Sequence, residues 1–132
     1  MPRKLTPAES AYCGQSGTAY WRRNIKRLKR EQDARRRALR WLPQKIELMQ
    51  QPWLEVGCGR GFNLQRGDTG LDIDKRQLAY LPAGVKGIWS SARHIPVADN
   101  SFAVIFSVGC LMHMEGGEPL QQALQEMARV SG

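Results

Sequence analysis

The chain has 132 residues, enough for one domain with a modest core and too few for a second domain of ordinary size. Hydrophobic residues make up 42% and charged residues 24%, a balance typical of a soluble globular protein. No apolar run approaches the ~20 residues that cross a bilayer, and the first residues lack the apolar centre of a signal peptide. These features exclude a membrane-spanning segment and predict a cytoplasmic protein with no membrane partner.

The cysteines and histidines do not suggest a metal site. Cys13, Cys58 and Cys110 form no C-x-x-C pair, and only Cys110 and His113 stand close together, without a second such pair to complete a ligand set. We therefore expect three free thiols and no bound metal.

Positive charge is concentrated in one segment, residues 22–45. It holds eleven basic residues and only two acidic ones, a net charge of +9, whereas the rest of the chain carries −1. Apolar residues recur at a spacing of three to four through Tyr20–Leu42, which predicts a helix with a narrow apolar face, and Gln44–Gln51 is a second candidate helix. The cationic face is either an ordinary solvated surface or a site for a polyanion, chiefly RNA, and we favour RNA.

From Trp53 onward, short apolar strands alternate with helices. This order predicts an α/β domain with a parallel sheet and right-handed crossovers. The expected strands are Trp53–Val56, Thr69–Ile73, Val85–Ser90 and Phe102–Val108, and the expected helices are Phe62–Arg66, Lys75–Leu81 and Pro119–Val130. We therefore treat residues 1–132 as one domain, with residues 1–52 as a basic helical segment and residues 53–132 as the α/β core.

A glycine-rich turn follows the first strand. Gly57, Gly59 and Gly61 have the spacing G-x-G-x-G, whereas a dinucleotide fingerprint would require glycine in place of Phe62. Glycines let backbone approach a ligand closely, and the helix that follows offers unpaired N–H groups. Together with Glu55 before the turn and Asp72 at the end of the second strand, which can accept hydrogen bonds from ribose hydroxyls, the pattern predicts a nucleoside site.

Four segments in the same order resemble class I S-adenosylmethionine-dependent methyltransferases. They are WLEVGCGRG, GLDID, ARHIPVADNSFAVIFSVGCLMHM and ALQEMARVS, within residues 53–131. A weaker similarity, carried by TPAESAYCGQSGTAYWRRN and by SVGCLMHMEGGEPLQQALQEMARVS, is to methylases associated with pseudaminic acid biosynthesis. It implies that the N-terminal segment helps to close over the cofactor.

The resemblance implies a truncated Rossmann-like sheet of strand order 3-2-1-4 and S-adenosylmethionine as cofactor. Gly57, Cys58 and Gly59 would lie against its methionine part, Asp72 would bind the ribose, and Ile73 would pack near the adenine. Ser91, Ala92 and Arg93 would border the adenine ring, and residues from Ser107 to Cys110 would face the reacting methyl group.

The chain departs from the family pattern in three places. Ala103 stands where the family usually has an acid, and the stretch from Gly61 to Thr69 is short. The sequence stops at Gly132, where the family continues with strands five to seven. The expected strand Phe102–Val108 would then be an open apolar edge, so we predict a homodimer that covers it.

His113 is the candidate catalytic base because it follows the fourth strand, and Glu115 is a second choice. A structural role for His113, capping a turn or packing under the last helix, stays open, and His94 is read as a loop residue.

Tyr12, Tyr20 and Trp21 either line a lid over the cofactor or anchor the N-terminal helix; we favour anchoring, with Tyr20 the expected cofactor neighbour. The predicted function is methyl transfer, with RNA as the favoured acceptor; the alternatives are a small polar metabolite or sugar, or a non-catalytic cofactor-binding module.

Overall fold

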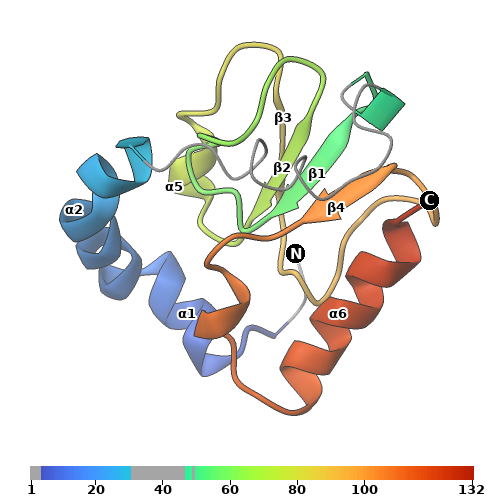
Figure 1. The fold of residues 1–132 in the computed structure, drawn as a ribbon. Coiled ribbons are helices and arrows are strands. Elements are labelled where there is room, and N and C mark those ends of the chain that lie inside the picture. The colour runs from blue at the N-terminus through green and yellow to red at the C-terminus, as the bar shows by residue number, and fades with distance from the viewer. Residues whose placement is uncertain (1–3, 31–46, 49) are drawn as a thin grey trace.

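The computed structural model describes residues 4–30, 47–48 and 50–132. Its elements, labelled as in Figure 1, are α1 (Pro7–Cys13), α2 (Gln15–Arg30), β1 (Trp53–Val56), β2 (Thr69–Asp72), α5 (Lys75–Leu78), β3 (Lys86–Trp89), β4 (Val104–Phe106), the 3-10 helix η1 (Leu111–His113) and α6 (Glu118–Val130). None of the described helices is long and apolar enough to cross a membrane.

The four strands form one parallel sheet in the order β3-β2-β1-β4, which confirms the predicted topology. Leu54 is in register with Thr69 of β2 on one side and with Ile105 of β4 on the other, and Thr69 is in register with Lys86 of β3. The chain therefore reverses its winding direction between β1 and β4. In sheets of this kind the ligand crevice lies beyond the carboxyl ends of the strands at that point.

The core lies between the sheet and α6. Leu54, Val56 and Leu71 from the central strands pack with Ala123 and Val130 of α6, and all five are at most 1% exposed. Figure 1 shows α6 running beneath the sheet, beside β4. Burial of β1 along its whole length explains why three of its four residues are apolar, and it buries the fourth, Glu55, with them.

The segment after the glycine loop is not the helix that its sequence suggested. Residues 62–66 form successive turns, with Leu64 N donating to Gly61 O and Asp68 N donating to Gln65 O. The Asp68 carboxylate accepts from Gln65 N and also from Trp53 N at the start of β1. These bonds tie the short connection directly to the sheet and leave too few residues for a crossover helix.

Other expected boundaries also change. β2 ends at Asp72 rather than Ile73, and α6 begins at Glu118 rather than Pro119. α5 ends at Leu78 rather than Leu81, and β3 runs from Lys86 to Trp89 rather than from Val85 to Ser90. β4 is Val104–Phe106, shorter at both ends than the expected Phe102–Val108. Phe102 instead forms a parallel bridge with Ser131, because the end of α6 brings the chain back beside it.

Two helices precede the sheet and lie across the end at which its strands finish (Figure 1). α1 was not predicted; Pro7 occupies its first turn, and Thr6 and Glu9 form a reciprocal capping box. α2 begins at Gln15, five residues before the expected start at Tyr20. Residues 31–46, which hold most of the rest of the basic segment, lie outside the described residues.

Candidate active site

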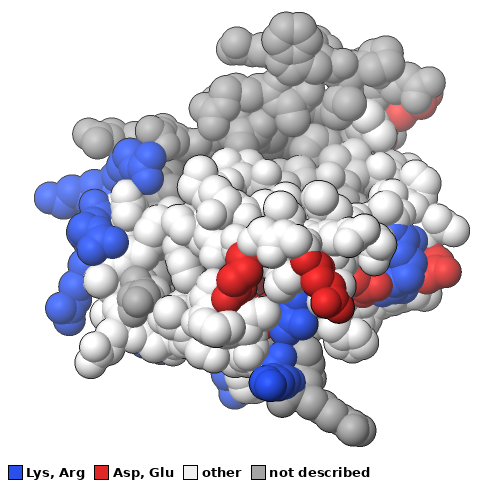
Figure 2. Space-filling model, turned by 90° about the horizontal axis from the view of Figure 1, so that it is seen from below, with Lys and Arg blue, Asp and Glu red and all other residues white. Residues whose placement is uncertain are grey.

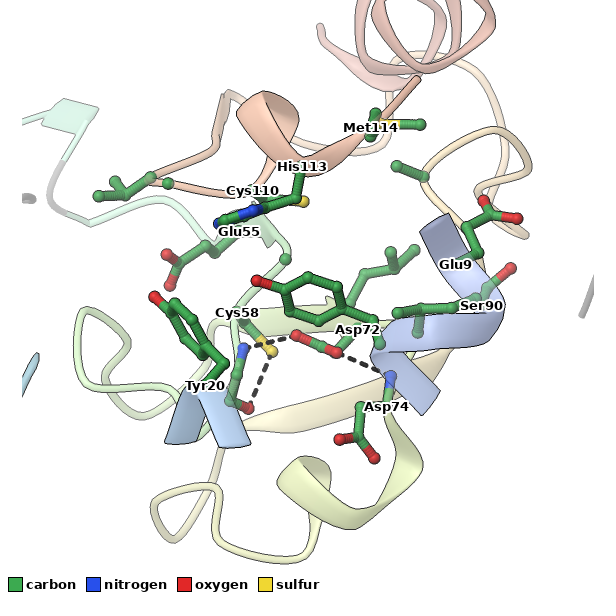
Figure 3. A pocket seen from close by; sticks show the side chains of 18 of the residues that line it. Glu9, Tyr20, Glu55, Cys58, Asp72, Asp74, Ser90, Cys110, His113 and Met114 are labelled. Carbon is green, nitrogen blue, oxygen red and sulfur yellow. Dashed lines mark hydrogen bonds between the residues drawn. The ribbon is translucent and has the colours of Figure 1, made fainter. Parts of the chain in front are cut away.

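A cavity of about 170 Å³ lies between the carboxyl ends of the strands and the two N-terminal helices. Its floor comes from the loops after β1, β2, β3 and β4, and its opposite wall comes from α1, α2 and η1. Figure 3 shows Asp72 near the centre of this site, with Tyr20, His113 and Glu9 around it. The location is the one expected for a ligand crevice in a sheet of this order.

The glycine loop is held open and covered by neighbouring side chains. Gly57 and Gly59 have positive φ values of 75° and 54°, which other residues rarely adopt. A Cβ atom on Gly57 would lie 2.3 Å from Cys110 Cβ, and one on Gly59 would lie 2.4 Å from Cζ2 of Trp21. Both positions thus require glycine for conformation and for space.

Asp72 organises the centre of the cavity. One carboxylate oxygen accepts a hydrogen bond from Gly59 N and the other accepts from Asp74 N, each at 2.8 Å (Figure 3). Each oxygen keeps a further lone pair for a ligand. Burial raises the pKa of Asp72, and the two backbone N–H groups act against that rise. The carboxylate therefore both fixes the glycine loop and offers acceptor sites to the cavity.

Glu55 is a second buried carboxyl group in the cavity wall. It is 2% exposed, and one oxygen accepts from Asn63 Nδ2 at 3.1 Å. The other oxygen has no hydrogen-bond partner within the part of the chain that the structure describes. Burial raises the pKa of Glu55 to about 8, so near neutral pH this carboxyl group is mostly protonated and can both donate and accept hydrogen bonds with a polar ligand.

Among the described residues that line the cavity there is no Lys or Arg, and there are four carboxyl side chains: Glu9, Glu55, Asp72 and Asp74. Glu9 pairs with Arg93 and Asp74 pairs with Arg76, but neither arginine lines the cavity. A protein with a net charge of +8 thus encloses a cavity bounded by carboxylates. Such an environment favours a cationic ligand and disfavours a phosphate or pyrophosphate.

Aromatic rings form the wall opposite the sheet. The His113 ring lies 5.1 Å from the Tyr12 ring and 5.7 Å from the Tyr20 ring, measured between centroids. Tyr20 contacts Trp21 edge to face, and Trp21 contacts Phe62 beside the glycine loop. No hydrogen bond joins the His113 imidazole or the two phenol groups to any described residue. Burial also raises the pKa of Tyr12 to about 12, which keeps that phenol neutral.

An ion pair that sequence reasoning missed holds α1 against the core. Arg93 donates to both oxygens of Glu9, at 3.1 Å and 2.9 Å, and Ser91 Oγ also donates to this carboxylate. Burial tends to raise the pKa of Glu9, but the hydrogen bonds from Arg93 and Ser91 lower it below its ordinary value. Glu115 adds a second tie by accepting from Ala8 N at 2.9 Å. We call the Glu9, Ser91 and Arg93 group the α1 latch.

Most of the residues assigned to the site from sequence line this one cavity. They are Tyr20, Glu55, Gly57, Cys58, Gly59, Asp72, Ile73, Ala92 and His113. Four others lie outside its lining. Gly61 packs beneath Leu81 and Pro82, Ser107 Oγ donates to Val56 O, and Ser91 and Arg93 belong to the α1 latch.

Tyr12 and Trp21, weighed from sequence as either lid or anchor, also line the cavity, as do Asn63 and Ser90. Glu115 does not line the cavity and instead ties α1 to the loop before α6. His94 lies in the loop after β3, as expected. Within the described residues, no three His, Cys, Asp or Glu side chains gather in a way that could hold a metal ion.

Comparisons with known proteins agree with this arrangement. Residues 54–131, more than half of the chain, match the methyltransferase domain family. The chain therefore belongs to that family of S-adenosylmethionine-dependent proteins, as the resemblance implied. No curated protein matches the sequence.

Several solved structures share the fold. One is the complex between the Haloferax volcanii Trm112 methyltransferase activator and a chain described as a methyltransferase, with a TM-score of 0.68, 15% identity, and coverage of 94% of this chain and 55% of that one. Another is a SAM-dependent methyltransferase of Thermotoga maritima described as a possible histamine N-methyltransferase. It has a TM-score of 0.60 and 20% identity, and the match covers 86% of this chain and 52% of that one. The YcgJ protein of Bacillus subtilis has a TM-score of 0.53 and 23% identity, and the match covers 61% of this chain and 39% of that one. The chain thus spans from about two fifths to just over half of these proteins.

The cavity fits the cofactor of this family. S-adenosylmethionine carries a sulfonium, an ammonium and a carboxylate group, and the cavity offers carboxyl groups and aromatic faces to the two cations but no Lys or Arg side chain among the described residues. Asp72 keeps free lone pairs beside the glycine loop, and Glu55 has an oxygen without a partner in the described chain. These are the acceptors that hydroxyl and ammonium donors require.

Proposed function

We propose that this protein is an S-adenosylmethionine-dependent methyltransferase that acts on RNA. The observation that carries the proposal is one cavity in which the open glycine loop, Asp72 and the other carboxyl side chains face His113. Family membership supports the cofactor, and the geometry supports the way it is held.

When bound, S-adenosylmethionine supplies a methyl group on a positively charged sulfur, already activated for displacement by a nucleophile. The protein then has to hold the acceptor in line and exclude water. Tyr12, Tyr20 and Trp21 of the N-terminal helices cover the cavity and serve the second task. Asp72 and the glycine loop would hold the adenosine and methionine parts of the cofactor.

His113 is positioned to take a proton from the acceptor. It lies in η1, directly after the loop that follows β4, and its ring faces the cavity between the two tyrosine rings. Because neither imidazole nitrogen is bonded to a described residue, one of them would be available to take the proton that the acceptor loses when its lone pair displaces the sulfur, which would leave as a neutral thioether, from the methyl carbon.

The preference for RNA rests on α2. Tyr20 and Trp21 of this helix line the cavity, while Arg22 and Arg23 of the same helix are exposed outside it. Attraction to phosphates would therefore act on the helix that forms the cavity wall. Small acceptors do not need such a surface.

Incubating a cell extract with the protein and S-adenosylmethionine labelled in its methyl group tests the proposal. The extract is then separated into RNA, protein and small molecules. We expect label in RNA, with at least a tenfold loss for His113→Gln and little change for His94→Gln, a loop histidine outside the cavity. Label only in small molecules would overturn RNA as acceptor, and cofactor binding without any label would identify a non-catalytic module.

A further inference from the structure

A second hollow lies on the outer side of α2. It is lined by the first turns of this helix and by three arginines, Arg22, Arg23 and Arg76, with no acidic side chain among its described lining residues. Figure 2 shows Lys and Arg side chains gathered at the edge of the molecule that α2 forms. The hollow and the cofactor cavity are thus on opposite sides of one helix, with opposite signs of charge.

Arg76 forms the fixed wall of this hollow. Its guanidinium donates to both oxygens of Asp74, to Thr18 Oγ1 at 2.9 Å and to Gly14 O at 3.0 Å. These bonds leave one N–H of the guanidinium unused and hold its plane at the start of α2. Because Asp74 offsets its charge, Arg76 contributes mainly a preoriented donor.

Arg22 and Arg23 supply charge that no described residue compensates. Both are exposed, and neither side chain makes an ion pair or hydrogen bond with any described residue. The first turn of α2, which also borders the hollow, adds the partial positive charge of a helix N-terminus. Two free guanidinium groups beside an oriented third one match the several oxygens of a phosphate group.

We propose that this hollow binds a backbone phosphate of the RNA acceptor, an inference that rests on the proposed function. A membrane surface fits less well, because no exposed large apolar side chain of the described chain belongs to α2. The Arg76 guanidinium donates to the Asp74 carboxylate, which lines the cofactor cavity, so a phosphate held here lies next to an ion pair that the two sites share. A flexible single strand can therefore be anchored at the hollow while a neighbouring nucleotide reaches the cavity.

Two paired variants separate a built phosphate site from a diffuse positive field. Arg22→Gln with Arg23→Gln removes two charges from the hollow, and Lys26→Gln with Arg27→Gln removes two from the next turn of the same helix, outside the hollow. The affinity for a fluorescent single-stranded RNA oligonucleotide is measured by anisotropy as a function of salt. We expect about tenfold weaker binding for the first pair, with a salt slope flatter by about 0.7, the contribution of one phosphate, and at most about twofold for the second.

Equal losses for the two pairs would overturn the site. The site would also be overturned if vesicles containing phosphatidylserine bound the wild type but not the first variant, and the wild type did not bind RNA. Unchanged melting temperatures and unchanged cofactor affinity in the first variant show that the fold and cavity are intact. The labelling experiment is independent, since an RNA-binding hollow without methyl transfer would reject the proposed function and leave the phosphate site standing.

Discussion

At the scale of single residues, Asp72 has two roles that the sequence suggested only in part. An acid at this strand end could be assigned to ribose from its position after β2. Its bonds to Gly59 N and Asp74 N depend on two chain segments that meet only in the folded structure. Removing the carboxylate therefore affects both ligand binding and the shape of the loop that receives the ligand.

We predict that Asp72→Ala weakens S-adenosylmethionine binding by about 1.5–3 kcal/mol, the usual cost of losing a hydrogen bond to a charged group. Isothermal titration calorimetry measures the change. Asp99→Ala is the matched control because Asp99 is exposed and pairs with Arg129 away from the cavity. Equal affinities for Asp72→Ala and wild type would show that this carboxylate does not hold the cofactor.

Glu55 should make stability depend on pH. Its pKa is raised by burial to about 8, above the ordinary value of 4.5, so the folded protein holds a proton that the unfolded chain releases between these pH values. The contribution of the Glu55 proton to the free energy of unfolding is complete below pH 4.5. It is lost as pH rises toward 8, at about 1.4 kcal/mol per pH unit. Glu55→Gln stays neutral, so its free energy of unfolding should not show this fall with rising pH. Chemical unfolding of both proteins at pH 5, 6.5 and 8 measures the difference. Parallel stability curves would contradict the assignment.

At the scale of elements, the sequence predicted the parts with strong local signals. β1, the glycine loop and α6 follow from apolar spacing and glycine positions, and their order led to the correct sheet. α1 and the turns at residues 62–66 could not be foreseen in the same way. They depend on the Glu9–Arg93 pair and on the Asp68–Trp53 hydrogen bond, which join residues far apart in the chain.

The α1 latch should hold the N-terminal helices over the cavity. Glu9 is 8% exposed and the Arg93 side chain 16%, so Arg93→Gln leaves a largely buried carboxylate without its cation. We expect destabilisation of about 3 kcal/mol and faster proteolysis near α1. The control is Lys86→Gln, an exposed change on β3. If both variants melt and cleave like wild type, the ion pair does not hold α1 in place.

At the scale of the whole molecule, the sheet has an outer edge at β4. Among the described residues, no strand pairs with Val104–Phe106 on the side away from β1. The open edge is shorter than the sequence suggested because Ser131 already pairs beside Phe102. Its three residues are apolar and half-buried, so another chain could pair with their free backbone groups.

We propose that two copies associate through this edge, with the adjoining α6 helices contributing to the contact. Light scattering after size-exclusion chromatography at micromolar concentration should give twice the monomer mass of 14.9 kDa. Val104→Lys should reduce the dimer, since it places a charge within β4 at a half-buried position outside the core cluster, whereas Lys86→Gln on the opposite edge strand β3 should not. A monomeric wild-type protein would refute the dimer.

The central claim is that the acidic cavity at the strand ends binds S-adenosylmethionine. Backbone amide NMR of the intact protein during titration with this cofactor tests the claim most directly, because it needs no variant that could misfold. We predict saturable shifts centred on Gly57–Gly59, on Asp72 and Ile73, and on Cys110–His113, with little change at Arg22 and Arg23. Shifts confined to the outer side of α2, or none at saturating cofactor, would contradict the account.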